Sequence, residues 1–247
     1  MPKSADPLSR VKSVVERLRD PMTGCEWDRV QTFATIAPYT IEEAYEVADA
    51  ITRNDVTGLR EELGDLLFQV VLHARIAEQS GQFSLDDVAI ALADKMERRH
   101  PHIFGSAATR PDWESMKATE RSADSALDGV ALALPALMRA EKIQKRAART
   151  GFDWPDSDGP RNKVTEELDE VAAAETDDAR EDEVGDLLFA VVNLARHLKV
   201  DPEVALRRAN SKFERRFRAI EITEGFADMS LDEKEALWTA AKEAQRN

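Results

Sequence analysis

The chain has 247 residues, of which 43% are hydrophobic and 33% charged, and this composition provides for one or two ordinary globular cores. Its formal net charge of -14 disfavours binding to nucleic acids, because such binding depends on Lys and Arg side chains that neutralise phosphates. Since no apolar run is as long as a membrane span and Met1 to Asp20 contain no signal-peptide core, we expect a cytoplasmic protein without membrane contact.

Apolar residues recur with the period of an α-helix, and no segment shows the alternation that is typical of a strand. The pattern predicts helices over residues 7–19, 41–53, 56–79, 85–100, 134–148, 161–175, 178–198, 202–224 and 231–245. We therefore expect an all-α fold. Segments 66–72 and 187–192 are apolar nearly all round, which predicts helices that are buried on most sides.

Several short motifs occur twice along the chain in the same order. The repeated pairs are Gly24/Trp27 with Gly151/Trp154, residues 62–68 with 183–189, residues 95–99 with 212–216, and Trp113/Lys117 with Trp238/Lys242. A repeat of this length corresponds to a whole compact domain and not to a solenoid unit. We therefore predict two tandem helical-bundle repeats, over residues 1–120 and 121–247.

Acidic residues form the most conspicuous part of the repeat. Each copy has five of them in two groups with helical spacing: Glu42, Glu43, Glu46, Glu62 and Asp65, then Glu166, Glu167, Glu170, Glu183 and Asp186. Residues three or four apart share one face of a helix, so two such helices would bring four carboxylates together. Carboxylates that share a partly buried site need a cation to neutralise them. The pattern therefore predicts a site for a divalent metal ion in each repeat.

Two structural alternatives concern the same residues. Acidic residues on helices often form a solvated face, and Thr40 with Glu43 matches a capping box, although the second repeat lacks this box. Gly64 and Gly185 interrupt helix-forming sequence just before an Asp, where each costs about 1 kcal/mol relative to alanine. Because both repeats have this destabilising glycine at the same position, the pattern favours a site where another group approaches the backbone closely.

The ligand types indicate which metal to expect. A di-iron bundle needs paired Glu-x-x-His motifs, but only Glu97 and His100 form one. Zinc is disfavoured by four scattered histidines and the single Cys25, and residues 156–159 lack the ligand spacing of a calcium loop. A site made only of carboxylates favours Mg²⁺, with Mn²⁺ as the alternative.

These motifs, together with residues 24–28 (Gly-Cys-Glu-Trp-Asp) and 212–217 (Lys-Phe-Glu-Arg-Arg-Phe), resemble the MazG family of two-domain nucleoside triphosphate pyrophosphohydrolases, within the all-α NTP pyrophosphatase superfamily. The resemblance implies a homodimer that hydrolyses nucleoside and deoxynucleoside triphosphates to monophosphate and pyrophosphate, depends on Mg²⁺, tolerates different bases and clears the nucleotide pool. Phe33 and Glu26 replace the His and Pro expected in the family. Both changes lie in the first repeat, so we expect the main activity in the second.

The resemblance also implies roles for individual residues. The expected metal ligands are Glu167, Glu170, Glu183 and Asp186, and, in the first repeat, Glu43, Glu46, Glu62 and Asp65. We expect Glu166, and Glu42 at the matching position, to orient or deprotonate the attacking water, with support of the ligands as the alternative role.

Basic and aromatic residues complete the predicted site. The expected substrate-binding residues are Lys163, Lys212, Arg215, Arg216, Trp238 and Lys242. Trp238 could stack on the base or be a core residue, and the cations could hold phosphates or form a solvated patch. Two other functions stay open from the sequence alone: a protein that binds metal and nucleotide without turnover, as a sensor or scaffold, and an interaction bundle whose acids are surface residues.

Overall fold

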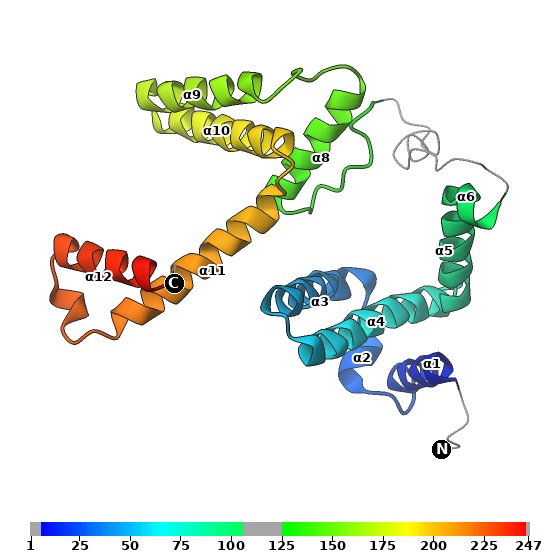
Figure 1. The fold of residues 1–247 in the computed structure, drawn as a ribbon. Coiled ribbons are helices and arrows are strands. Elements are labelled where there is room, and N and C mark those ends of the chain that lie inside the picture. Colours follow the sequence, from blue (N-terminus) through cyan, green and yellow to red (C-terminus); the bar gives the residue numbers. More distant parts are fainter. Residues whose placement is uncertain (1–5, 106–124, 246–247) are drawn as a thin grey trace. The chain divides into compact units, whose positions relative to one another are not determined.

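The computed structural model describes residues 6–105 and 125–245. The chain divides into two compact units, Met1–Arg121 and Ser122–Asn247. All regular elements within the described ranges are helices, which confirms the predicted all-α class (Figure 1). None of these helices combines the length and apolar character that crossing a membrane requires. Trp113, Lys117 and the predicted boundary between residues 120 and 121 lie outside the described residues.

The first unit is built around a helical hairpin. Its helices are α1 (Pro7–Leu18), α2 (Glu26–Val30), α3 (Phe33–Arg53), α4 (Val56–Gln79), α5 (Leu85–Arg99) and α6 (Pro101–Phe104). The turn between α3 and α4 is tight because Asn54 adopts a left-handed conformation and the Asp55 carboxylate caps α4 by accepting from the Gly58 N–H. Helix α1 packs on α4, and Val15 of α1, Ile36 of α3 and Val71 and Leu72 of α4 form the core.

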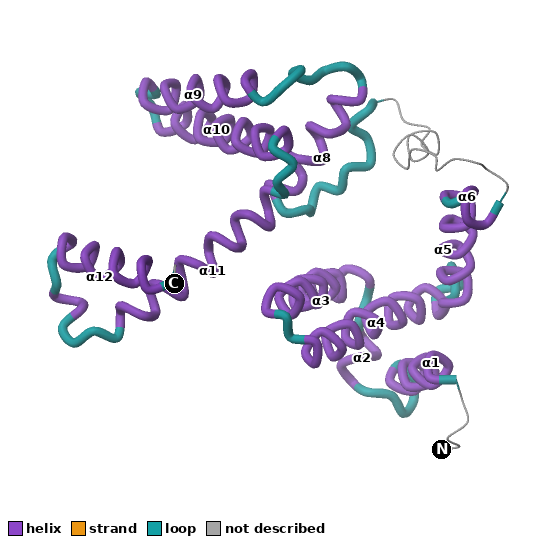
Figure 2. The backbone as a smooth tube through the Cα atoms, viewed as in Figure 1, coloured by secondary structure: helices purple, strands orange, loops and turns teal. Residues whose placement is uncertain are grey.

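The second unit repeats this arrangement and extends it. Its elements are α8 (Ala136–Arg149), α9 (Asp158–Ala173), α10 (Asp177–His197), α11 (Pro202–Glu221), the 3₁₀ helix η1 (Phe226–Asp228) and α12 (Leu231–Ala244). Helices α9 and α10 form the hairpin, α8 packs on α10, and α12 lies along α11 (Figure 2). Each hairpin therefore places its two acidic helices side by side.

The start of α3 differs from the prediction. The helix begins at Phe33 and not near residue 41, after a capping box formed by Thr32 and Thr35. Thr40 lies inside the helix, where its hydroxyl donates to the Ile36 carbonyl, so the capping box proposed for Thr40 and Glu43 is wrong. Pro38 did not end the helix, since a proline there removes a single backbone hydrogen bond while the buried Ile36 anchors this part of the helix on the core.

The apolar helices α4 and α10 are also less buried than predicted. Val71 and Leu72 are buried, but Leu63, Leu67 and Val70 are 49%, 36% and 40% exposed. At the matching positions of α10, Val184, Leu188 and Val191 are 41%, 52% and 44% exposed. We call these two sets the apolar stripes. Each has i, i+4, i+7 spacing and so covers one helix face that its own hairpin leaves open.

Gly64 and Gly185, which lie directly before the Asp of each second acidic pair, face no other helix of the described chain at close range. Apart from its chain neighbours and the adjacent backbone of its own helix, a Cβ atom placed on Gly64 or Gly185 would meet no described atom within 4 Å. The expected close approach of another group to these backbones is therefore not made by the described part of the chain itself.

Candidate functional site

The second hairpin brings three of its predicted ligands together. Glu167, Glu170 and Glu183 each offer a carboxylate oxygen, and these oxygens lie within 4.8 Å of one another. Glu167 is only 3% exposed, and its Oε2 has no hydrogen-bond partner. A buried carboxylate oxygen without a partner is costly, so this donor set fits a cation that would supply the missing interaction. Oxygen ligands of this kind suit a hard divalent metal ion.

Lys163 provides positive charge in this cluster. Its ammonium nitrogen lies 2.8 Å from Glu166, 2.6 Å from Glu167 and 4.0 Å from Glu170. Hydrogen bonds to Glu166 and then to Glu167 raise the pKa of Lys163 well above its ordinary value. The Lys163 ammonium group therefore supplies part of the positive charge that the carboxylates need. Lys163, which was predicted to bind substrate, and Glu166, which was predicted to orient or deprotonate the attacking water, form an ion pair in this structure.

The neighbouring carboxylates raise the pKa of Glu170. The hydrogen bond with Glu167 raises the pKa of Glu170, with further contributions from burial and from the charges of Glu167 and Glu183. Asp186 lies outside the group of three, although it lines a cavity together with Glu167. The arrangement is therefore a concentrated negative site into which one or more cations would bind favourably.

The first hairpin forms a similar but not identical cluster. Carboxylate oxygens of Glu43, Glu62 and Asp65 lie within 4.8 Å of one another. Burial, followed by the charges of Asp65 and Glu46, raises the pKa of Glu43, so Glu46 acts on the cluster although it lies outside the group of three. Glu42 is exposed on α3 beside Glu43.

The two clusters differ in what faces the carboxylates. The position of Lys163 in α9, four residues before Glu167, is occupied by Tyr39 in α3, four residues before Glu43. Tyr39 packs edge-on against Trp27, and the first cluster instead has a hydrogen bond of 3.4 Å from Gln69 Nε2 to Glu43. Sequence reasoning missed this difference, although aligning the two acidic motifs would have found it. Lys163 therefore gives the second cluster a cation at a position where the first cluster has the uncharged Tyr39.

The predicted basic and aromatic residues other than Lys163 form a separate group. Lys212, Arg215 and Arg216 lie on α11, and Trp238 and Lys242 lie on α12. Trp238 is partly buried against Phe213, with ring centroids 5.1 Å apart, and the Arg216 guanidinium lies 5.7 Å from the indole centroid. Among the described residues, no hydrogen bond, ion pair or ring contact joins this group to the carboxylates of α9 and α10. The contacts of Trp238 thus fit the core alternative within one chain.

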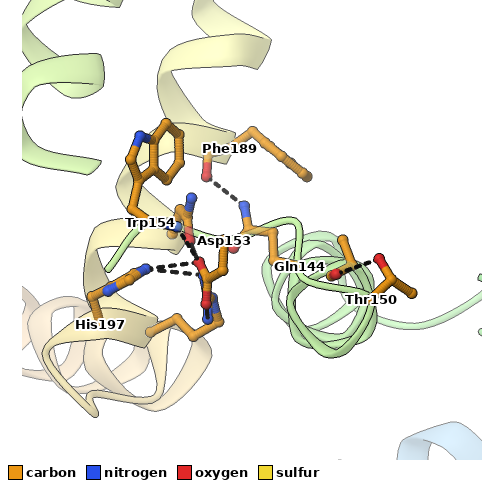
Figure 3. Close-up of polar contacts among 9 residues, drawn as sticks. Gln144, Thr150, Asp153, Trp154, Phe189 and His197 are labelled. Carbon is orange, nitrogen blue, oxygen red and sulfur yellow. Dashed lines mark hydrogen bonds and ion pairs between the residues drawn. The ribbon is translucent and has the colours of Figure 1, made fainter. Parts of the chain in front are cut away.

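A cavity of about 770 Å³ adjoins the second cluster. It lies among α8, α9 and α10, and the loop from α8 to α9 contributes Phe152, Asp153 and Trp154 to its wall. The Arg196 guanidinium of α10 holds this loop by donating to both Asp153 oxygens, and the His197 Nε2 lies 3.0 Å from the same carboxylate (Figure 3). The loop is therefore fixed on α10 by an ion pair. Sequence reasoning did not identify the Asp153–Arg196 pair.

The Asp153 pair predicts how acid affects the second unit. Hydrogen bonds from Arg196, with smaller effects of His197, lower the pKa of Asp153 from 3.8 to about 2. Because the folded-state pKa is lowered, the pair stabilises the fold above pH 3.8 and loses this contribution as the pH falls towards about 2. We expect Asp153→Ala to lower the free energy of unfolding at pH 7, and the difference from the unsubstituted protein to shrink below pH 4. Urea titrations at several pH values would measure this, and a difference independent of pH would contradict it.

Comparison with known proteins places these helices in a family. A family model described as the MazG nucleotide pyrophosphohydrolase domain matches the chain twice, over residues 31–104 and 160–220. The first match contains α3 and α4, and the second contains α10 and nearly all of α9. Both carboxylate clusters therefore lie inside the matched segments.

Three relatives illustrate the similarity. The chain is 53% identical over 228 residues to the nucleoside triphosphate pyrophosphohydrolase of Escherichia coli (strain K12), with 87% of each chain covered. It is 46% identical over 213 residues to the nucleoside triphosphate pyrophosphohydrolase/pyrophosphatase MazG of Thermotoga maritima, covering 85% of this chain and 83% of the relative. It is 37% identical over 174 residues to the nucleoside triphosphate pyrophosphohydrolase of Mycobacterium tuberculosis, covering 68% and 50%.

Proposed function

This chain belongs to the MazG family of nucleotide pyrophosphohydrolases, as its repeated motifs predicted, and we propose that it hydrolyses nucleoside and deoxynucleoside triphosphates to monophosphate and pyrophosphate. The observation that carries the proposal is the buried, unpartnered Glu167 oxygen within a carboxylate cluster of the matched domain. Such hydrolysis needs a site where negative phosphates and an attacking water can be held together. Removal of unwanted triphosphates from the nucleotide pool is the role we propose for it.

We propose that Glu167, Glu170, Glu183 and Asp186 hold Mg²⁺, with Mn²⁺ as the alternative. When bound, the metal would offset the negative charge on the phosphoryl oxygens and favour ionisation of a water molecule. Glu166 would accept the proton of the attacking water at a carboxylate oxygen, or fix the orientation of that water. Its exposed position, one residue before the buried Glu167, supports such a role at the edge of the cluster.

Lys163 would change partners during this cycle. In the present structure its ammonium neutralises Glu166 and Glu167. Once these carboxylates have another counter-charge, the ammonium is free to donate to phosphate oxygens of the substrate. Because Tyr39 stands at the matching position of the first repeat, we propose that residues 121–247 form the main catalytic repeat and residues 1–120 a weaker or non-catalytic one.

We also propose a homodimer. The two apolar stripes are too exposed for a stable isolated surface and would be covered in an interface. The basic and aromatic residues of α11 and α12 make no described contact with the α9 and α10 carboxylates of their own chain. A second copy could bring its own set to the substrate: Lys212, Arg215, Arg216, Trp238 and Lys242. The partner copy would then complete the phosphate-binding side of the site.

The products formed from ATP test the proposed reaction. With ATP labelled on its γ phosphate and Mg²⁺, we expect the label in pyrophosphate and AMP as the second product, because cleavage falls between the α and β phosphates. Thin-layer chromatography separates the possible products. Label released as inorganic phosphate together with ADP would contradict the proposal. Metal-dependent binding of ATP without any cleavage would favour the non-catalytic sensor or scaffold.

A further inference from the structure

The cavity beside the second cluster has the size and lining of a small-molecule site. Its volume of about 770 Å³ falls within the range of roughly 300–1,000 Å³ that is usual for such sites. Lys163, Glu167 and Asp186 line it together with the aromatic residues Phe152 and Trp154. A ligand with a charged end and a flat apolar end would therefore match both kinds of wall.

Gln144 lines this cavity and carries a hydrogen-bond acceptor without a partner. The residue is only 6% exposed and lines the cavity from α8. Its Nε2 donates to the Phe189 carbonyl at 2.8 Å, which fixes the orientation of the amide (Figure 3). The Oε1 atom is buried and has no partner among the described residues. An acceptor left in this state indicates that a donor comes from outside the chain.

Asn193 presents the complementary group from α10. It is 9% exposed and lines the same cavity. Its Oδ1 accepts from Arg196 Nε at 3.1 Å and from Arg196 Nη2 at 2.7 Å. Because a guanidinium only donates, these bonds fix the oxygen on that side and leave the Asn193 amide nitrogen as a donor for another group. The cavity thus offers one acceptor and one donor.

The positions of Gln144 and Asn193 are occupied by apolar residues in the first repeat. Aligning Leu8-x-Arg10 with Leu137-x-Arg139 matches Val15 to Gln144, and the motif of residues 62–68 matches Leu72 to Asn193. Val15 and Leu72 are both 0% exposed and pack together in the core of the first unit. The second repeat therefore has polar side chains where an apolar pair would fill the core. Since buried polar groups destabilise a fold unless they are partnered, a ligand would compensate for this exchange.

The aromatic wall is held in place by its surroundings. A Cβ atom on Gly159 would clash with the Trp154 ring, so only glycine lets the indole pack at this place. The preceding Asp153 is tied to Arg196, whose guanidinium also contacts Asn193. The indole, the amide of Asn193 and the guanidinium are therefore positioned as one connected group, and the flat indole offers a stacking surface.

We infer that this cavity binds the nucleobase of the triphosphate, with Gln144 and Asn193 hydrogen-bonding its edge and Trp154 flanking its face. The inference rests on the proposed function. Every nucleobase edge carries both donors and acceptors, and the phosphates would extend towards Lys163 and the carboxylates that line the same cavity. It also replaces Trp238 as the predicted platform for the base.

The test separates the base from the phosphates. We would measure kcat/KM for ATP and for ribose 5-triphosphate, which lacks a base, in the unsubstituted protein and in a Gln144→Val, Asn193→Leu double variant that copies the first repeat. The ratio of the two values should fall roughly tenfold or more in the double variant, because hydrogen bonds to the base are lost. The value for ribose 5-triphosphate should change little. Trp238→Ala serves as the control and should leave the ratio unchanged.

A single isosteric change keeps the test independent of folding. Asn193→Asp retains an oxygen that accepts from Arg196 and exchanges the amide donor for a second carboxylate oxygen, whose negative charge the adjacent Arg196 guanidinium offsets. It should therefore lower the same ratio while the melting temperature is maintained. An unchanged ratio in both cavity variants, or a ratio that falls only in Trp238→Ala, would overturn the inference. An equal fall for both substrates would also overturn it, because the cavity would then support the reacting phosphates.

If the proposed function is wrong, no form of the protein will cleave ATP, and this result differs from a failure of the base-binding inference. If no variant cleaved ATP, the same comparison would be made by calorimetry with α,β-methylene ATP and α,β-methylene ribose 5-triphosphate. A base-binding cavity would still be supported if Asn193→Asp bound α,β-methylene ATP more weakly than the unsubstituted protein does, and bound α,β-methylene ribose 5-triphosphate equally well. Equal binding of the two analogues to the unsubstituted protein would overturn the inference without bearing on hydrolysis.

Discussion

Glu183→Ala is expected to lower pyrophosphohydrolase activity more than about 100-fold. Substitutions of residues that merely support metal ligands already lower metal affinity or activity roughly 10- to 100-fold, and Glu183 is itself an expected ligand. Glu183 contributes one of three oxygens that lie within 4.8 Å of one another. Its removal would weaken metal binding and leave Glu167 and Glu170 to share less counter-charge. Steady-state kinetics at saturating Mg²⁺ would measure the loss, and circular dichroism would verify that the helices remain.

Glu62→Ala is the matched control in the first repeat. Glu62 occupies the same motif position and belongs to the corresponding group of three carboxylates. We expect a much smaller loss of activity, because Tyr39 stands where the second repeat has Lys163, and Phe33 replaces an expected histidine and stacks on His73 with ring centroids 5.9 Å apart. A protein inactivated by Glu62→Ala but not by Glu183→Ala would show that the first repeat is the catalytic one.

The sequence was sufficient to predict the hairpins because their signals are local. Helices α4 and α10 have strong apolar periodicity, and their N-terminal caps Asp55 and Thr176 are standard capping residues. The spacing of the acidic pairs predicted four carboxylates in each cluster, because neighbouring antiparallel helices bring their matching faces together. Three of the four meet in each hairpin, whereas Glu46 and Asp186 lie outside the groups of three. The start of α3 was less predictable, because the core contact of Ile36 stabilises a turn that contains Pro38.

Contacts between distant segments could not be read from periodicity. The bond from Gln144 to the Phe189 carbonyl joins residues 45 positions apart, and Asp153 meets Arg196 across 43 positions. A buried Gln inside an amphipathic helix has the same pattern as an exposed one, so nothing local distinguishes it. Comparison of the two repeats is informative here, because replacement of Val15 by Gln144 and Leu72 by Asn193 indicates a changed interior.

Exposure of the apolar stripes leads to the second large effect that we expect. The six stripe residues, at matching positions in the two repeats, are each at least 36% exposed in the chain. An apolar helix face of this kind is usually covered in the functional assembly. In the proposed homodimer, light scattering at micromolar concentration should give about twice the 27.6 kDa of one chain. A mass of one chain would contradict the dimer and would indicate that the stripes, if covered at all, are covered within one molecule.

Leu188→Glu should then raise the dissociation constant of the dimer at least about tenfold, because a charged side chain at the centre of an apolar interface loses its hydration without gaining a partner. Ile90→Glu is the matched control: Ile90 is 58% exposed and lies on α5, outside the stripes and outside the helices that carry the residues proposed to reach the partner's substrate. Sedimentation equilibrium would measure both variants. Leu67→Glu tests the stripe on α4 in the same way. If only Leu188→Glu dissociates the dimer, the interface lies on α10. If Leu67→Glu and Leu188→Glu each dissociate it, the interface includes the stripes of both repeats. If neither stripe variant dissociated the dimer, its interface would lie on another face, and the stripes would need a different occupant.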